Sequence, residues 1–143
     1  MNMSKEHHDK GKSKSRILIV DDHAVVRQGL TLLINQECDL VVCDEAENAT
    51  DALEIIEKQQ VDLAIVDISL DGTNGIQLTE TIKSQHPHLP VLVLTMHDGA
   101  LYAKRAFQAG AKGYITKHEA AETVITAIRL MLSGKEYINE TMT

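Results

Sequence analysis

Four short apolar runs in this chain each lead into a polar residue, and the polar residues differ in kind. The runs 17–20, 63–66, 91–94 and 113–116 lead into, or end in, the acids Asp21 and Asp22, the acid Asp67, the hydroxyl of Thr95 and the ammonium of Lys117. Continuous aliphatic and β-branched runs are typical of parallel strands buried on both faces. Open α/β sheets bind ligands beyond the carboxyl ends of their strands. We therefore expect these side chains to meet at one sheet edge and to form a site for phosphate chemistry.

Segments with helical spacing of apolar residues alternate with these runs, which predicts βα units and a parallel sheet. A further strand is expected over residues 40–43, at a sheet edge because acids follow it directly. Five strands and five helices with right-handed crossovers predict a doubly wound sheet covered on both faces, a three-layer α/β/α architecture. Gly110 and Gly134 are expected to end the last two helices.

Length and charge limit the function classes. The 143 residues are expected to form one domain. No apolar run approaches the roughly 20 residues that span a membrane. Residues 1–15 are polar and are interpreted as a disordered tail, not a secretory signal. The whole chain has a net charge of −7, and residues 1–16 hold five of its 14 basic but two of its 21 acidic residues. An acidic remainder argues against direct binding of nucleic acid.

The cysteines and histidines give weaker signals. Cys38 and Cys43 lack CxxC spacing, and no export signal precedes them, so we expect reduced thiols in a cytoplasmic protein, with Cys43 in the core. A zinc site would need more soft ligands than this, and His86 and His88 flank a proline in a turn.

Three carboxylates at one sheet edge cannot all ionise without compensation, because like charges raise one another's pKa. Mg²⁺ resolves this, since it prefers carboxylates, waters and phosphate oxygens. Asp67 follows a deeply buried run and is the candidate nucleophile, because a carboxylate attacking phosphorus gives an acyl phosphate. Lys117 and Thr95 suit the phosphoryl oxygens. Capping acids, a strand-ending threonine and a solvated lysine are the structural alternatives, and their occurrence together disfavours them.

With these residues in place, the chain resembles a receiver domain of the two-component response regulators over about residues 16–133. The resemblance is carried by the paired acids Asp21 and Asp22, the phosphoacceptor Asp67, the hydroxyl of Thr95, the aromatic Tyr114 and the site lysine Lys117. It implies a flavodoxin-like (βα)5 fold with strand order 2-1-3-4-5. It also implies that a histidine kinase transfers a phosphoryl group to Asp67.

The resemblance assigns further roles to these positions. Mg²⁺ or Mn²⁺ would be held by Asp22, Asp67 and the backbone carbonyl of Ser69, with Asp21 acting largely through a metal-bound water. Phosphorylation would move Thr95 and change the rotamer of Tyr114, although a strand aromatic without a switch role is the alternative for Tyr114. We also predict that Ser69 and His97, each two residues past a site residue, tune the lifetime of the phosphoryl group.

Residues 21–23, 95–98 and 109–114 resemble the NarL/FixJ subfamily, in which a LuxR-type helix-turn-helix domain follows the receiver. Residues 134–143 resemble the start of its interdomain linker. A basic recognition helix is not found in the sequence, so we interpret the chain as an excised receiver, with a single-domain regulator as the alternative. DNA would be bound only through the missing domain. Phosphorylation is expected to allow a homodimer. The sequence leaves open whether the partner surface is formed by the first and last helices or by the fourth helix and the fifth strand.

One residue departs from the receiver pattern. His118 follows Lys117, where receivers usually carry a proline in a cis peptide. A cis bond without proline costs about 3 kcal/mol. We therefore expect either a strained cis bond or a trans bond with Lys117 displaced from Asp67.

Two other protein classes share part of this pattern. A phosphohydrolase of the haloacid dehalogenase type also uses a strand-end aspartate, but it needs a second acid two residues later, where this chain has Ser69. A degenerate receiver acting only as an interaction module would lack an acid or the lysine, and only the His118 departure favours it. We expect a signalling switch rather than an enzyme, catalysing only its own phosphotransfer and slow autodephosphorylation.

Overall fold

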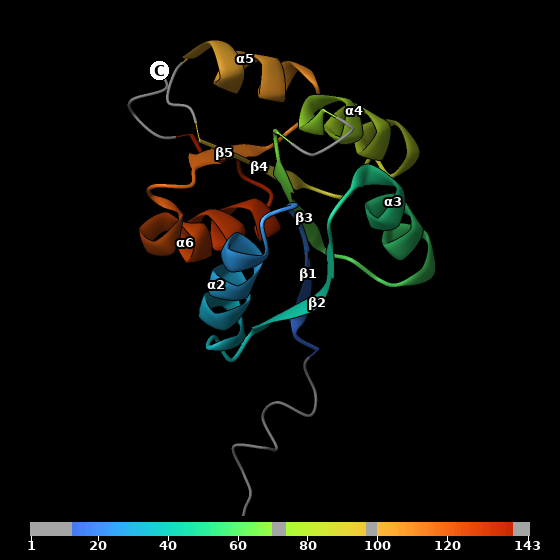
Figure 1. Cartoon of the computed structure of the whole chain (residues 1–143). Helices are drawn as coiled ribbons and strands as arrows, with labels where there is room; N and C mark the ends of the chain where they lie inside the picture. Colours follow the sequence, from blue (N-terminus) through green and yellow to red (C-terminus); the bar gives the residue numbers. More distant parts are fainter. Residues whose placement is uncertain (1–12, 70–73, 97–99, 139–143) are drawn as a thin grey trace, which may run out of the picture.

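A computed structural model of the chain describes residues 13–69, 74–96 and 100–138 (Figure 1). It contains one five-stranded parallel sheet in the order β2-β1-β3-β4-β5, which confirms the predicted fold class and strand order. The strands are β1 (Ser15–Val20), β2 (Leu40–Ala46), β3 (Leu63–Asp67), β4 (Val91–Thr95) and β5 (Gly113–Thr116). The order reverses between β1 and β3, so the carboxyl ends of these neighbours border the crevice where such sheets bind ligands.

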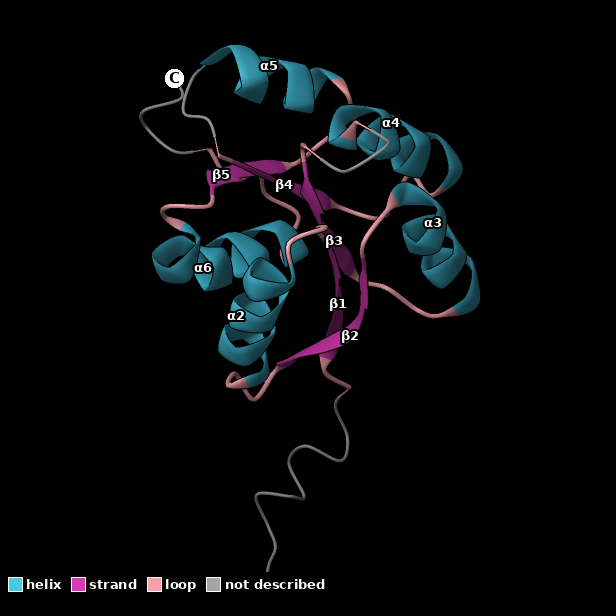
Figure 2. Ribbon diagram, viewed as in Figure 1, coloured by secondary structure: helices cyan, strands magenta, loops and turns pink. Residues whose placement is uncertain are grey.

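Helices cover both faces of the sheet (Figure 2). Helices α2 (Ala24–Asn35) and α6 (Ala120–Leu132) pack on one face, and α3 (Ala49–Lys58), α4 (Gly75–Gln85) and α5 (Ala100–Gln108) pack on the other. The side chains of each central strand alternate between two apolar clusters. In β1, for example, Ile17 and Ile19 join the α2/α6 cluster, whereas Leu18 and Val20 join the cluster under the other three helices. This two-sided burial explains the uninterrupted apolar runs.

Two strand boundaries differ from expectation. Strand β2 runs to Ala46 rather than ending at Cys43, because its acids find partners: Asp44 accepts a hydrogen bond from Gln59 and Glu45 pairs with Arg27. Strand β1 begins at Ser15, which we expected in the tail, because its N–H donates to the carbonyl of Asp39. The rest of that predicted tail, residues 1–12, lies outside the described residues.

The two glycines that were expected to end helices do so. Gly110 and Gly134 both follow a helix with positive φ, at +111° and +95°, the conformation that favours glycine. After Gly134 the chain returns to the sheet, where Tyr137 donates a backbone hydrogen bond to Lys112 and bridges to Gly113 beside β5. The predicted linker is therefore anchored beside the edge strand as far as Tyr137.

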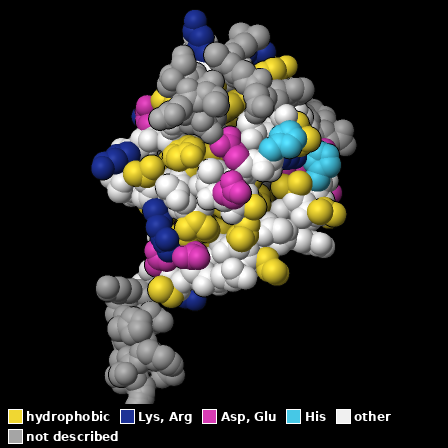
Figure 3. Space-filling model, turned by 90° about the vertical axis from the view of Figure 1, so that its left-hand side faces the viewer, with side chains coloured by type: hydrophobic (Ala, Val, Ile, Leu, Met, Phe, Trp, Pro, Cys, Tyr) yellow, Lys and Arg dark blue, Asp and Glu magenta, His cyan; other side chains and the backbone are white. Residues whose placement is uncertain are grey.

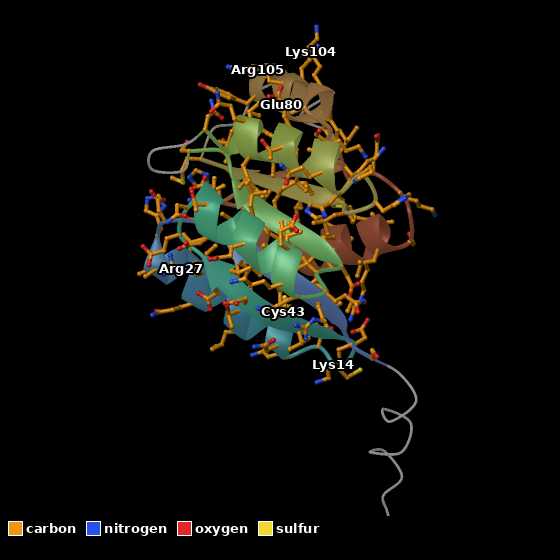
Figure 4. The ribbon with its side chains drawn as sticks, turned by 90° about the vertical axis from the view of Figure 1, so that its right-hand side faces the viewer. Lys14, Arg27, Cys43, Glu80, Lys104 and Arg105 are labelled. Atoms are coloured by element: carbon orange, nitrogen blue, oxygen red, sulfur yellow. The ribbon has the colours of Figure 1, made fainter. Side chains whose placement is uncertain are left out.

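The surface carries few large exposed apolar side chains. In the described part of the chain these are Val25, Leu32, Met96 and Ile138. Figure 3 shows one side of the molecule, where hydrophobic side chains in yellow lie among acidic and basic ones. Each helix that the structure describes is too short or too polar to cross a bilayer. Cys38 is exposed and Cys43 is half-buried in the edge strand (Figure 4), so the expected core position of Cys43 is wrong.

Candidate functional site

The ends of β1 and β3 bring three acids together. Val20 pairs with Val66 in the ladder between these strands, so the next residues, Asp21 and Asp67, lie side by side at the sheet edge. Asp21 is fully buried, Asp67 is 1% exposed, and the side chain of Asp22 is 24% exposed. The backbone N–H of Asp21 donates to Ala46 of β2, which fixes the turn that follows β1.

The ammonium of Lys117 neutralises part of this negative charge. Its Nζ lies 2.9 Å from Oδ2 of Asp21 and 3.2 Å from Oδ2 of Asp67, and the lysine side chain is only 9% exposed. The structure thus unites the acids of β1 and β3 with the lysine that follows β5. A close cation at this depth offsets the cost of burying neighbouring carboxylates.

The loop after β5 holds Lys117 in place through its backbone. The N–H of Lys117 donates to the carbonyl of Thr95 at 2.7 Å, extending the ladder between β4 and β5. One residue earlier, the N–H and the hydroxyl of Thr116 both donate to Oε2 of Glu119 at 3.1 Å. The first bond ties Lys117 to β4, and the other two join the residues on either side of it, Thr116 and Glu119.

This geometry shows that our expectation for the Lys117–His118 bond is wrong. The described residues, which include both of these, contain no cis peptide bond. Lys117 nevertheless reaches Asp67 at 3.2 Å. The hydrogen bonds of Lys117 to Thr95 and of Thr116 to Glu119 position the lysine without the bend that a cis-proline would supply.

Burial and neighbouring charges shift the pKa values of Asp67 and Lys117. Burial raises the pKa of Asp67 and the nearby charge of Asp21 adds to the rise, whereas the Ser69 amide and Lys117 oppose it. Burial alone would lower the pKa of Lys117, but its close ion pair with Asp21 and the charge of Asp67 outweigh this and raise it. Lys117 therefore stays cationic, and Asp67 is a more basic carboxylate than a solvated one.

Ser69 and Gly75 define the loop after β3. The N–H of Ser69 donates to Oδ1 of Asp67 at 3.1 Å, and the exposed Ser69 lies beside the acids. Gly75 donates from its N–H to Ile68 at 2.9 Å, so α4 begins against the end of β3. A Cβ on Gly75 would overlap the carbonyl oxygen of Asp67. The glycine allows this close approach of two backbones.

The two predicted switch residues lie deeper in the fold. Thr95 ends β4, one strand away from Asp67, and its side chain is fully buried. Tyr114 is fully buried in β5, among the apolar side chains under α3, α4 and α5. His97 lies outside the described residues.

Sequence reasoning assigned no role to His23, which the structure places at the centre of the acidic cluster. Its Nδ1 lies 2.9 Å from Oδ1 of Asp21 and 3.1 Å from Oδ1 of Asp22. The position of this histidine directly after the acid pair was the available signal. Nearby, Arg27 of α2 (Figure 4) donates to the carbonyl of Asp21 at 2.6 Å and braces the same turn.

The donor set fits a hard divalent cation. Oδ2 of Asp21 and Oδ1 of Asp22 are buried and accept no hydrogen bond from the described residues, although cationic or imidazole nitrogens lie close to both. Together with Asp67, they offer carboxylate oxygens that point at one another, and ligand atoms of this cluster all lie within 4.8 Å. Such a convergence of under-satisfied oxygens is what Mg²⁺ or Mn²⁺ would complete.

Comparison with known proteins places this chain in a family. The response regulator receiver domain matches residues 17–129. The oxygen regulatory protein NreC of Staphylococcus carnosus (strain TM300) is 37% identical over 129 residues, which are 90% of this chain and 59% of that protein. The chain thus spans less than two thirds of this relative's length.

Solved structures of response regulators are also similar to this chain. A LuxR-family two-component response regulator from Aurantimonas sp. SI85-9A1 superposes with a TM-score of 0.86 at 34% identity, covering 91% of this chain and 93% of that one. The RcsB response regulator of Salmonella typhimurium, studied for its DNA interaction, superposes with a TM-score of 0.84 at 26% identity. This match covers 91% of this chain and 65% of that one. Receiver domains of this family bind Mg²⁺ at their aspartate cluster and interact with histidine kinases. The chain belongs to the response regulator receiver domains, and within them to the NarL/FixJ type.

Proposed function

We propose that Asp67 accepts a phosphoryl group from a sensor histidine kinase and that the phosphorylated domain switches an output. The observation that supports this best is the buried Asp67 carboxylate, held between the Ser69 amide at 3.1 Å and the Lys117 ammonium at 3.2 Å. An ionised nucleophile with positioned donors around it is the arrangement that phosphoryl transfer requires.

The transfer itself is a displacement at phosphorus. An oxygen of Asp67 attacks, an O–P bond forms, and the P–N bond of the kinase phosphohistidine breaks. The imidazole leaves with the electron pair of that bond and takes up a proton. Lys117 stays charged because its pKa is raised, so its ammonium can pair with a phosphoryl oxygen.

Asp22, Asp67 and the backbone carbonyl of Ser69 are proposed to hold Mg²⁺ or Mn²⁺, and Asp21 to act through a bound water. A bound divalent ion would neutralise charge on the phosphoryl oxygens. The amide of Ser69 already fixes Oδ1 of Asp67. Ligand atoms of Asp21, Asp22 and Asp67 lie within 4.8 Å of one another, which is close enough for one ion and its bound waters.

Thr95 and Tyr114 are proposed to read the phosphorylated state. The Thr95 carbonyl is bonded to the N–H of Lys117, so a shift of β4 toward a phosphoryl group would also pull the loop after β5. Tyr114 lies in that same β5, two residues before Thr116. Phosphorylation adds roughly −1.5 to −2 charges at pH 7, a large perturbation for a site already crowded with acids.

The output is proposed to be transcriptional. A helix-turn-helix domain that follows the receiver would bind DNA, and phosphorylation would favour a homodimer. The LuxR-family neighbour and the DNA interaction studied for RcsB support this output. The anchoring of Tyr137 beside β5 would carry a change in that strand into the linker. The expected cytoplasmic location stays a prediction.

Incubation with Mg²⁺ and acetyl phosphate, followed by mass spectrometry, tests the proposal. We expect a stoichiometric adduct of one phosphoryl group that is acid-stable, base-labile and lost in Asp67→Asn. Slow decay of the adduct would fit a signalling switch with autodephosphorylation, and rapid turnover of acetyl phosphate would instead indicate a hydrolase. A protein that gains no adduct would be an interaction module. Changed decay rates in Ser69→Ala and His97→Ala would support their tuning role, and unchanged rates would refute it.

A further inference from the structure

His23 offers the acidic cluster a fourth donor that is not an oxygen. Its Nδ1 lies 2.9 Å from Asp21 Oδ1, 3.1 Å from Asp22 Oδ1 and 3.8 Å from Asp67 Oδ2. The imidazole therefore faces all three carboxylates at once. The residue lies between the end of β1 and the start of α2, so the same turn that aims the acids also aims the ring.

These spacings match ligands around one ion. In an octahedral site with bonds of about 2.1 Å, adjacent ligand atoms are about 3.0 Å apart and opposite ones about 4.2 Å. The separations of His23 Nδ1 from the oxygens of Asp21 and Asp22 equal the adjacent spacing, and its separation from Asp67 lies between the two values. A single ion could touch the nitrogen and the carboxylates with little movement.

The Lys117 ammonium shows where a cation belongs among these groups. Its Nζ lies 2.9 Å from Asp21, 3.2 Å from Asp67 and 3.3 Å from Nδ1 of His23. The same nitrogen is also at hydrogen-bond distance from Oδ1 of Asp21, and its role as donor or acceptor follows from its tautomer. In the tautomer protonated on Nε2, the lone pair of Nδ1 is available to a metal ion.

Other roles for the ring are already filled by the backbone. Oδ1 of Asp21 accepts a 2.8 Å hydrogen bond from the N–H of His23, so this oxygen has a donor without the imidazole. His23 is the N-cap residue of α2, but its side chain makes no capping hydrogen bond. The imidazole also lies 2.9 Å from Oδ1 of Asp21. The backbone donor to that oxygen remains without the ring, and the start of the helix does not depend on the ring.

We propose that His23 is a direct metal ligand and that this receiver site, with its imidazole and carboxylates, prefers divalent transition-metal ions over Mg²⁺. The inference rests on the metal site of the proposed function and goes beyond it by naming a ligand and a selectivity. Imidazole suits transition metals such as Mn²⁺ and Co²⁺, whereas Mg²⁺ favours an all-oxygen set. His23 is then the residue that determines metal preference.

Pulsed electron paramagnetic resonance of the Mn²⁺-loaded chain tests the ligand directly. The wild-type protein is expected to show nitrogen modulation from a bound imidazole, and His23→Ala is expected to lose it. His88→Ala is the matched control, because His88 is an exposed histidine preceding β4, at the opposite edge of the sheet. Circular dichroism should show an unchanged fold in both variants.

Calorimetric titration with Co²⁺ and with Mg²⁺ tests the selectivity. Loss of groups that merely support a metal ligand costs about 10–100-fold in affinity, so His23→Ala should lower Co²⁺ affinity by at least about tenfold and Mg²⁺ affinity by much less. His23→Asp replaces the nitrogen with an oxygen, so it should keep Mg²⁺ binding without restoring the preference for Co²⁺.

The outcomes separate the inference from the function on which it rests. A wild-type protein that binds Mn²⁺ and gains the acetyl phosphate adduct, but shows no nitrogen modulation, overturns the role of His23 and leaves the receiver function standing. Equal losses of Co²⁺ and Mg²⁺ affinity in His23→Ala also overturn the selectivity. A protein without metal binding or adduct overturns both.

Discussion

The backbone N–H of Lys117 donates a 2.7 Å hydrogen bond to the carbonyl of Thr95. This bond joins the last residue of β4 to the residue that follows the neighbouring β5, so the sheet itself fixes the position of the lysine. Its side chain then has a short, fixed path to Asp21 and Asp67. The bond also couples the hydroxyl-bearing end of β4 to the cation-bearing loop after β5, the two elements proposed to respond to phosphorylation.

Glu119 should matter for both stability and phosphorylation. Its carboxylate accepts hydrogen bonds from the N–H and hydroxyl of Thr116, next to Lys117. Glu119→Ala is expected to lower the free energy of unfolding by about 1 kcal/mol and to slow labelling by acetyl phosphate several-fold, because the lysine loop loses its brace. Denaturant unfolding and mass spectrometry measure the two effects. Glu122→Ala removes an exposed acid from the first turn of α6, the helix that Glu119 precedes, and should change neither quantity. Equal effects in both variants would refute the brace.

Most of the fold and the centre of the site could be predicted from local patterns. Buried parallel strands need continuous apolar runs, and the order of such strands brings their carboxyl ends together, so Asp21, Asp67 and Lys117 could be assigned to one edge. These are consequences of periodicity and topology that each strand carries in its own sequence.

The errors arose where distant side chains decide the local structure. Strand β2 continues through Asp44 because Gln59, from beyond α3, satisfies that acid. The trans peptide before His118 keeps Lys117 in place because Thr95, a residue of another strand, supplies the anchoring carbonyl. Both partners are distant in the sequence, so local sequence patterns could not predict these contacts. His23 was missed for a related reason, since its contacts depend on the turn geometry after β1.

Gly75 should tolerate no side chain. A Cβ there would overlap the carbonyl oxygen of Asp67 and lie 2.7 Å from Cα of Ile68, both backbone atoms that cannot rotate away. Gly75→Ala is expected to cost about 2–3 kcal/mol of stability and to reduce phosphorylation by displacing Asp67. Gly29→Ala is the control: this exposed residue in α2 has free space around it, and the change should stabilise the helix by about 1 kcal/mol. Thermal unfolding of the two variants should therefore shift in opposite directions.

Asp67 should destabilise the metal-free protein at neutral pH. Burial raises its pKa above the ordinary 3.8, so the folded state binds this proton more readily than the unfolded state. Its contribution to stability is therefore present at low pH and lost as the pH rises through the folded pKa. Asp67→Asn, measured with a chelator at pH 7, is expected to be more stable by about 1 kcal/mol, because Lys117 keeps its contact with Asp21.

This gain should shrink as the pH falls toward 3.8. Asp39 provides a control of opposite sign, because its hydrogen bond from Arg129 lowers its pKa. At pH values above 3.8, Asp39→Asn should lower the free energy of unfolding by a few tenths of a kcal/mol, roughly the contribution of an exposed ion pair. Denaturant titrations across the pH range measure both. A loss of stability in Asp67→Asn at pH 7 would mean that the Lys117 attraction outweighs burial.

Asp22 should carry the stabilisation that Mg²⁺ confers. Its Oδ1 is buried and accepts no hydrogen bond from the described residues, so a bound cation would relieve an existing cost. A ligand at 100 times its dissociation constant stabilises the folded state by about 2.7 kcal/mol, so the wild-type melting temperature should rise with Mg²⁺ and fall again with chelator. Asp22→Asn is expected to lose most of this rise, since a neutral amide is a weaker ligand. Glu80→Gln removes an exposed acid of α4 that is not part of the cluster, and this variant should keep the rise. Equal responses in the two variants would show that Mg²⁺ acts by general screening rather than at this site.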